Sequence, residues 1–398
     1  MVTVAERWNI HPCHSWLRGV RPDGPVQFSE EMGVWNVLDY REVFGIINDP
    51  RTFSSKTAYL APVTIDQSFT EGDFAQMDPP DQTRYRKLVS KAFTPRVVAG
   101  LEPRIVEVTG RLLDAMAGKP RIDLVEELAY PLPVIVIAEL MGIPSDDLEM
   151  FKKQAYIVIE QLNGVAFLNE NAEAQENINA AVEQFRPLVE YMHDQLAERR
   201  RAPREDMMSH LAVAEVEGQR LTDNEIVTIA NIMLVAGHIT TTMMIGNAVA
   251  CLDANPEAFA RVRADRSLVP TMLEETLRTL TPSAALSRRT TTEVEIGGIR
   301  IPAERLILVW PAAANRDPRT FADPEVFDPA RHPNPHLGFG HGVHYCIGST
   351  LAKLQGRIAL NALLDRFPVL RTDPDDPPRF FPSPDIIGTA SLPLCTHR

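Results

Sequence analysis

The chain contains little cysteine, and its cysteines are not arranged in pairs. The four in its 398 residues are Cys13, Cys251, Cys346 and Cys395. No two of them form a CxxC motif, and nothing in their spacing suggests a disulfide framework. This excludes a small disulfide-stapled secreted fold and fits a protein of the reducing cytoplasm.

The chain has fewer positive than negative charges, and its first residues do not form an apolar run. The formal net charge is −13 at neutral pH, which argues against nucleic acid as the main partner. The first residues, MVTVAERWNIHPCHSW, have neither an apolar signal core nor a cleavage-site pattern. The cluster of His11, Cys13 and His14 lacks a fourth ligand for a metal ion. We therefore expect residues 1–30 to form a flexible N-terminal tail.

One stretch, residues 226–252, is apolar and long enough to span a membrane. It carries Asn231, His238, Asn247 and a run of three threonines, which are groups that lipid-facing helices avoid. We interpret it as a helix, about 40 Å long, that is buried through the middle of a large protein. No contact with a membrane is expected.

The rest of the sequence predicts one domain over residues 1–398. Apolar residues make up 44% of the chain and charged residues 23%, which allows a large core with room for a cofactor. Residues 80–282 are rich in helical patterns, and residues 283–398 contain a hairpin, an irregular segment at 311–345 and a final helix. We expect a mainly α fold with small β-sheets at one side, an α+β fold.

Individual elements follow from periodicity and from turn and cap signals. Thr222 and Glu225 form a capping box before the long central helix, and Gly297-Gly298 marks the turn of a hairpin within residues 288–310. A strand is predicted at 34–38 and a loop at 58–76. Other helices are predicted at 40–48, 84–93, 97–117, 134–141, 148–162, 172–200, 269–279 and 347–367.

The segment with the strongest chemical signal is Phe339-Gly340-His341-Gly342-Val343-His344-Tyr345-Cys346-Ile347-Gly348. A lone cysteine is usually a small buried hydrophobe. Here the glycines let backbone amides approach the sulfur, and the start of the next helix adds positive potential. Both effects favour a thiolate, and a thiolate on haem iron favours cleavage of the O–O bond. Cys346 is therefore the candidate axial ligand of a haem iron.

This segment resembles the haem-binding signature of the cytochrome P-450 family, Phe-x-x-Gly-x-[His/Arg]-x-Cys-x-Gly, at every specified position. The resemblance extends over about residues 30–393 and is closest to the soluble bacterial members. It implies that a haem b group (iron protoporphyrin IX) is buried between the central helix and the loop and helix around Cys346. It also places Phe339, Gly340, Gly348 and Ala352 against the haem.

A second match to this family is Glu275-Thr276-Leu277-Arg278. Residues three apart share a helix face, so this carboxylate and guanidinium can pair, although most such pairs are exposed and weak. In the family the pair is buried and meets an arginine of the irregular segment, which here is Arg331. The resemblance thus implies a structural triad of Glu275, Arg278 and Arg331 that fixes the loop under the haem.

A third match is Ala236-Gly237-His238-Ile239-Thr240-Thr241, which resembles the family's oxygen-activation motif, [Ala/Gly]-Gly-x-[Asp/Glu]-Thr-[Thr/Ser]. The resemblance implies that Gly237 leaves room for dioxygen and that Thr240 hydrogen-bonds the bound oxygen. Ile239 stands where the family has an acid. We favour proton delivery by a polar group of the substrate; alternatively, Ile239 only packs the pocket and Thr240 with water suffices. The motif could also be plain core, with threonines bonding their own carbonyls.

The two haem propionates need cationic or hydrogen-bonding partners once buried. By resemblance the candidates are His344, Arg288 and Arg86. The family often has a histidine four residues before Arg86, and this chain has the neutral amide of Gln82 there. The alternative is that Gln82 and Arg84 lie on a solvated helix face.

The expected activity is that of a monooxygenase that inserts oxygen into, or oxidatively couples, a small organic substrate. No flavin or iron–sulfur domain is fused to the chain, so we expect electrons from a ferredoxin and its reductase. A basic patch near Lys87, Lys91 and Lys353 would steer an acidic carrier. Because Ile239 replaces the acidic residue of the oxygen-activation motif, an enzyme that uses peroxide as its oxidant is an alternative. A non-catalytic haem sensor is a third alternative, and turnover would exclude it.

The resemblance also implies where the substrate lies. The lining positions are residues 58–75 and 155–180, Val235, Ala236 and Ile239, and residues 283–287 and 385–387. They are largely apolar with scattered polar groups, as in most small-molecule sites. Such a lining fits terpenes, macrolides, peptides and aromatics alike.

Overall fold

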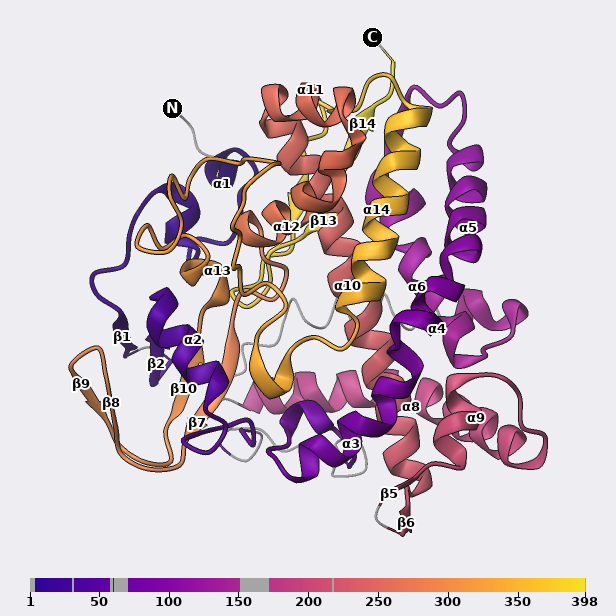
Figure 1. Cartoon of the computed structure of the whole chain (residues 1–398), viewed down its shortest axis with the longest axis vertical. Helices are drawn as coiled ribbons and strands as arrows, with labels where there is room; N and C mark the ends of the chain where they lie inside the picture. The colour runs from indigo at the N-terminus through magenta and orange to yellow at the C-terminus, as the bar shows by residue number, and fades with distance from the viewer. Residues whose placement is uncertain are drawn as a thin grey trace.

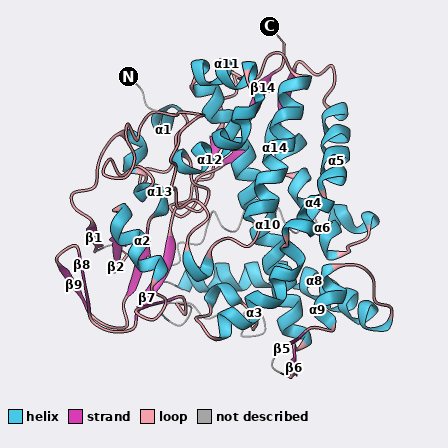
Figure 2. Ribbon diagram, in the orientation of Figure 1, coloured by secondary structure: helices cyan, strands magenta, loops and turns pink. Residues whose placement is uncertain are grey.

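The computed structural model describes residues 4–30, 32–57, 60, 71–150, 172–216 and 218–397. The helices are α1 (Val4–Arg7), α2 (Tyr40–Asn48), α3 (Asp81–Val89), α4 (Pro95–Gly100), α5 (Glu102–Ala115), α6 (Pro131–Met141), α8 (Ala172–Arg201), α9 (Met207–Ala212), α10 (Asp223–Ala254), α11 (Pro256–Ala264), α12 (Val269–Thr279), α13 (Pro311–Ala314) and α14 (Ser349–Arg366). They form a helical body with strands gathered mainly at one side, so the predicted fold class is confirmed (Figure 1; Figure 2).

The strands form small sheets. The largest has five strands in the order β1 (Val26–Ser29), β2 (Val34–Val37), β10 (Leu306–Val309), β7 (Leu286–Thr290), β3 (Phe53–Ser54), and only its β2–β10 pair is parallel. The predicted hairpin is β8 (Val294–Ile296) with β9 (Ile299–Ile301). Its turn residues Gly297 and Gly298 have φ of 56° and 81°, which favours glycine. The remaining strands are β4 (Arg121–Asp123), β5 (Glu215–Val216), β6 (Gln219–Arg220), β11 (Arg371–Thr372), β12 (Arg379–Phe380), β13 (Thr389–Ser391) and β14 (Pro393–Cys395).

Helix α10 runs through the middle of the body and contacts α6, α8, α12 and α14 (Figure 1). The predicted capping box is confirmed: the Thr222 hydroxyl accepts from the Glu225 amide at 3.1 Å, and the Glu225 carboxylate accepts from the Thr222 amide at 2.7 Å. Among the described helices, α10 alone has the length and composition to cross a membrane. Because 72% of its most apolar window is buried inside the protein, it is a core helix.

Helix α14 packs closely on α10 and α12, and this contact fixes the loop that precedes it. A Cβ atom on Gly356 would lie 2.8 Å from Cε of Met244 and 3.1 Å from a methyl group of Leu273. A larger side chain at this position would have to displace the ends of the Met244 and Leu273 side chains, so glycine allows this close packing without rearrangement. Cys346 lies three residues before α14, so the position of its loop relative to α10 follows from this packing.

Three boundary predictions need correction. The helix predicted at 84–93 begins at Asp81 and ends at Val89, and a 3-10 turn follows at Ser90–Phe93. The single helix predicted at 97–117 is divided into α4 and α5, because Pro103 would clash with the carbonyl of Ala99 in a continuous helix. The helix predicted at 134–141 begins at Pro131, where a proline is tolerated since the first amides have no partner. Most of the helix predicted at 148–162 lies outside the described residues.

Residues 4–18 are not the flexible tail that we expected. Trp8, Ile10 and Trp16 are buried in the main core, with at most 6% of each residue exposed. The ring of Trp16 lies 5.4 Å from that of Trp310, edge to face. Burying a large apolar side chain contributes roughly 1.5–3 kcal/mol, so these side chains hold the segment in place. The sequence prediction gave too little weight to its two tryptophans.

Candidate active site

A cavity of about 330 Å³ lies between α10 and the loop that precedes α14. Cys346 contributes to one wall, and Gly237 and Thr240 of α10 contribute to another. The structure thus brings two motifs that are far apart in the sequence to a single cavity. The predicted haem and oxygen residues that line it are Arg86, Ala236, Gly237, Thr240, Arg288, Phe339, Gly340, His344, Cys346, Gly348 and Ala352.

The loop around Cys346 is held by glycine turns and by contacts with α2 and α3. The Cys346 amide donates to the Phe339 carbonyl at 2.9 Å, and Gly340 and Gly342 have φ of 66° and 67°. A Cβ atom on Gly342 would lie 2.9 Å from Oδ1 of Asn48 in α2. From α3, Arg86 donates to the Tyr345 carbonyl at 2.5 Å. The loop therefore has a defined shape before any ligand is considered.

The electrostatics of the Cys346 sulfur differ in part from our expectation. The amides of Gly348 and Ser349 and the guanidinium of Arg86 lower the pKa of the thiol, as predicted. Burial has the larger effect and raises that pKa overall. These protein groups alone therefore do not make the thiolate the preferred form. A metal cation would, because a coordinating thiol is deprotonated outright.

One end of the cavity contains a buried cation, Arg288, which is attracted by the charge of Asp78 but is in no direct ion pair with any residue that the structure describes. Arg288 is 8% exposed, and its guanidinium donates to the Ser287 carbonyl at 2.7 Å. No carboxylate of the described residues forms an ion pair with it, and burial lowers its pKa to about 10. Burial and the Arg288 charge lower the pKa of the neighbouring His344 to about 4. Nε2 of His344 is 3.0 Å from the Ser55 hydroxyl. These residues fit an anionic group such as a haem propionate.

Gln82 stands where the family often has a histidine close to the haem propionates. It is not among the residues that line the cavity. It is 1% exposed, and its amide donates to the Val343 carbonyl at 2.7 Å. The alternative of a solvated helix face is therefore wrong for Gln82. Its neutral amide holds the Cys346 loop from behind.

Glu275, Arg278 and Arg331 meet behind this loop. Two bonds of 2.8 Å join Arg278 to Glu275, and the Arg331 Nε lies 3.0 Å from both oxygens of Glu275. The side chains of Glu275 and Arg278 are fully buried, and that of Arg331 is 11% exposed. This is a buried ionic network and not a solvated surface pair.

The threonines of α10 make the helix-internal bonds that were our alternative interpretation. Thr240 donates to the Ala236 carbonyl at 2.8 Å, and Thr241 to that of Gly237 at 2.9 Å. Thr240 nevertheless faces the cavity. A Cβ atom on Gly237 would lie 3.5 Å from the Ile137 side chain, an ordinary contact. The protein neighbours themselves therefore do not require glycine at this position.

His238 and Ile239 point away from the cavity. His238 is fully buried, its Nδ1 bonds the Leu234 carbonyl at 2.7 Å, and burial lowers its pKa to about 4. Ile239 packs with Met243 and Phe381 in an apolar cluster that also contacts Val235 and Ile386. Three positions assigned to the substrate pocket, Val235, Ile239 and Ile386, are thus brought together. Residues 58–59, 61–70 and 155–171 of that assignment lie outside the described residues.

Sequence reasoning missed a second polar group behind the loop. His336 bonds Glu274 at 2.7 Å and accepts from the Gly338 amide at 3.1 Å. Lys353 lies 3.1 Å from Glu274 and 5.5 Å from the centre of the Phe339 ring. Lys353 is therefore only partly available for the basic patch that we expected. The sequence feature that could have indicated this group is Glu274, which directly precedes Glu275 of the second motif.

These features define a class of protein. Among the described residues, no three His, Cys, Asp or Glu side chains gather into a site for a bare metal ion. A single cysteine sulfur in a large cavity, with a buried cation for acidic substituents, fits a metal that brings its own ring of ligands. This is the arrangement of haem-thiolate enzymes.

Comparisons with known proteins agree with this class. A family model described as "Cytochrome P450" matches residues 29–394. The chain is 38% identical to cyclomarin C epoxidase CymV of Salinispora arenicola, over 95% of this chain and 94% of that protein. It is 38% identical to the erythromycin C-12 hydroxylase of Saccharopolyspora erythraea, over 95% and 93%. The chain belongs to the cytochrome P450 family, and it is a monooxygenase with a haem-iron cofactor.

Solved structures show the same relationship. The crystal structure of HmtT, which is involved in himastatin biosynthesis, has 58% sequence identity and a TM-score of 0.91. The match covers 99% of this chain and 100% of that one. The similarity therefore extends over the whole fold as well as the Cys346 loop.

Proposed function

We propose that this monooxygenase holds haem b through Cys346 and oxidises a largely apolar natural product by hydroxylation, epoxidation or oxidative coupling. The observation that carries the proposal is a single cavity bounded by Cys346, Arg288 and Thr240. The bound haem would supply the oxygen-activating chemistry. Hydroxylases and epoxidases among the relatives support this reaction class.

Each residue around the cavity has a distinct part in this proposal. Arg288, His344 and Arg86 would bind the propionates, since their donors lie on the cavity or on its loop. Thr240 would release its bond to the Ala236 carbonyl and hold a proton donor in the cavity through its hydroxyl. The apolar side chains that line the cavity, Ile232, Met233 and Leu286, would contact the substrate and exclude water.

We also propose that the enzyme acts in the cytoplasm with a ferredoxin and a ferredoxin reductase as electron donors, and without a nucleic-acid or membrane partner. Lys87 and Lys91 are exposed close to Arg86, which bonds the Cys346 loop. A carrier docked there would lie close to the haem edge. Because Lys353 is paired with Glu274, the attraction would depend mainly on the residues of α3 and the segment after it.

A second candidate function is a peroxide-driven oxidase. The observation that favours it is Ile239, which has no titratable group at the position where the family has an acid. Peroxide already carries both oxygen atoms and their protons. Compounds that shift the haem spin state would serve as substrates, and product would be measured with reductase and ferredoxin or with hydrogen peroxide alone. Product with peroxide alone would support the second function, and product with the carriers alone the first.

The haem-thiolate site has a direct spectroscopic test. We expect the ferrous–CO complex of the holoenzyme to show the red-shifted Soret band of a thiolate-ligated haem. Cys346→Ser should lose this band. The matched variants Cys251→Ser and Cys395→Ser should keep it, because neither residue lines the cavity. A band retained in Cys346→Ser would show that the sulfur ligand lies elsewhere.

A further inference from the structure

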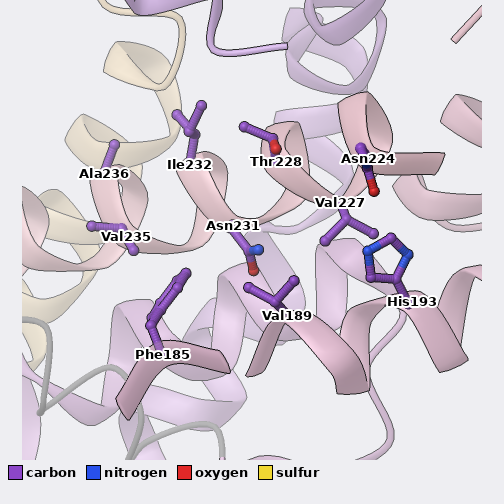
Figure 3. A pocket seen from close by; sticks show the side chains of 10 residues that line it. All are labelled: Phe185, Val189, His193, Asn224, Val227, Thr228, Asn231, Ile232, Val235 and Ala236. Carbon is purple, nitrogen blue, oxygen red and sulfur yellow. The ribbon is translucent and has the colours of Figure 1, made fainter. Parts of the chain in front are cut away.

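A second cavity, of about 250 Å³, lies between α8 and α10 (Figure 3). Phe185, Val189 and His193 of α8 line it on one side, and one face of α10 lines it on the other. It shares Ile232 and Ala236 with the cavity that contains Cys346, so the two adjoin along α10. A ligand long enough to pass these two side chains would occupy both cavities.

The lining of this second cavity changes from apolar to polar along α10. Near Ala236 the helix contributes Ile232 and Val235, and farther away it contributes Asn231, Thr228 and Asn224. None of the lining residues that the structure describes is Asp, Glu, Lys or Arg. Apart from the His193 imidazole on α8, these lining residues offer a charged group no partner of opposite charge, so an uncharged ligand fits best beside Asn231 and Thr228.

Among the residues that line this cleft, Asn231 has a buried polar atom whose hydrogen bonding the protein does not satisfy. It is 7% exposed, and its Oδ1 is buried without a hydrogen-bond partner among the described residues. Figure 3 shows its side chain pointing from α10 toward Phe185 and Val189. A buried, unpaired polar group costs about 1–3 kcal/mol. Asn247, the other asparagine buried in α10, also has an unpaired Oδ1, but its Nδ2 donates to two backbone carbonyls and it does not line the cleft.

We propose that the cleft between α8 and α10 is the distal subsite of the substrate cavity, and that Asn231 recognises an uncharged group that both donates and accepts hydrogen bonds, such as a carboxamide. The proposal rests on the proposed function, which places the oxidised end of the substrate near Thr240. Asn231 precedes Thr240 by nine residues, or roughly 13.5 Å along the helix. The substrate is thus elongated, with an apolar middle and this polar group more than one helical turn from the oxidised end.

The test uses probes anchored at the iron of the holoenzyme. Imidazoles carrying an N-alkyl chain bind haem iron through the free ring nitrogen and shift the Soret band. One series of increasing chain length would end in –CH2–C(=O)NH2, and the matched series in an isobutyl group, –CH2–CH(CH3)2, which has the same shape. At the chain length that reaches Asn231, the carboxamide probe should bind roughly tenfold more tightly. Shorter chains should show no such preference.

Asn231→Leu should abolish the preference for the carboxamide and leave the affinity of the isobutyl series unchanged or higher. Its melting temperature should not fall, because Oδ1 of the amide has no partner to lose. Asn361→Leu, the same change on α14 outside the cleft, should keep the preference. Equal binding of both series to the wild type, or a preference that survives in Asn231→Leu, would overturn the proposal. If no imidazole shifts the Soret band, the haem site of the proposed function fails instead.

Discussion

Burial acts on Cys346 and Arg288 in the same way, by penalising the charged form of each. It raises the pKa of the thiol and lowers that of the guanidinium. Each group becomes favourable only when a partner of opposite charge arrives. Haem carries both partners, a metal cation and two carboxylates, so one ligand would relieve both penalties. The cost of burying these residues is therefore consistent with a cofactor site.

Arg288→Leu should lose haem faster than the wild type. A hydrogen bond to a charged group contributes roughly 1.5–3 kcal/mol, which corresponds to haem loss roughly ten- to a hundredfold faster. The measurement is the rate of haem transfer to excess apomyoglobin. Arg288→Lys, which keeps the charge, should lie between the two. An unchanged rate in Arg288→Leu would mean that the guanidinium does not bind the propionates.

Ile239 provides the residue-scale test of proton delivery. We predict that the wild type forms much product per reductant consumed with its own substrate, and little with an analogue that lacks the polar group. Ile239→Glu should restore part of that coupling, although the carboxyl would enter the apolar cluster of Met243 and Phe381 and have a raised pKa. Ile239→Gln is the matched control and should restore nothing. Equal coupling for both molecules in the wild type would exclude assistance by the substrate.

At the scale of elements, α12 explains how the irregular segment can be long without being loose. Arg278 donates to the carbonyls of Asn315, Pro324 and Val326. Arg331 donates to those of Ala322, Asp323 and Val326, while Glu275 binds both arginines. Side chains thus replace the backbone hydrogen bonds that a helix or sheet would provide. The position of the Cys346 loop depends on these hydrogen bonds from side chains to backbone carbonyls.

Glu275→Ala and Arg331→Ala should therefore yield little haem-loaded protein, although neither residue touches the cavity. Removing one member leaves the others buried and unpaired, at a cost of about 3–5 kcal/mol. Arg261→Ala is a matched control, because its 3.1 Å pair with Asp328 is exposed and should contribute little. Haem content and melting temperature are the measurements. Normal values for both buried variants would show that the network does not fix the loop.

At the scale of the whole molecule, the N-terminal segment contacts residues 380–384, which lie close to the C-terminus in the sequence. The Cys13 thiol lies 3.8 Å from the Pro384 carbonyl, and Trp8 stacks on Phe380 at 5.5 Å. Phe381, the next residue, packs with Ile239. The first residues thus contact the segment that contributes Phe381 to the apolar cluster of Ile239 and Met243.

Trp16→Ala should destabilise the fold by about 3–5 kcal/mol, because it opens a cavity beside Trp310 in the main core. Val20→Ala, four residues later at a position 57% exposed, should change the stability by less than about 0.5 kcal/mol. Thermal unfolding of both variants measures the difference. Equal melting temperatures would mean that residues 4–18 are not part of the cooperative fold.

What the sequence determined by itself is local. The bounds of α2 and α12, the capping box of α10 and the Gly297-Gly298 turn depend on residues within a few positions of one another, and all were predicted correctly. The family and the candidate axial ligand, Cys346, also follow from a short motif. Such features are readable because dihedral preferences and helix caps act between near neighbours.

Only the tertiary structure decided the features that join distant segments. It buried Gln82 against Val343, packed residues 4–18 into the core, and turned Ile239 toward Phe381. It also left Oδ1 of Asn231 without a partner in the cleft between α8 and α10. In each case the partner lies on another element, and which elements meet is set by the packing of the whole core. Local propensity and spacing carry no record of that packing, so the sequence alone could not determine these contacts.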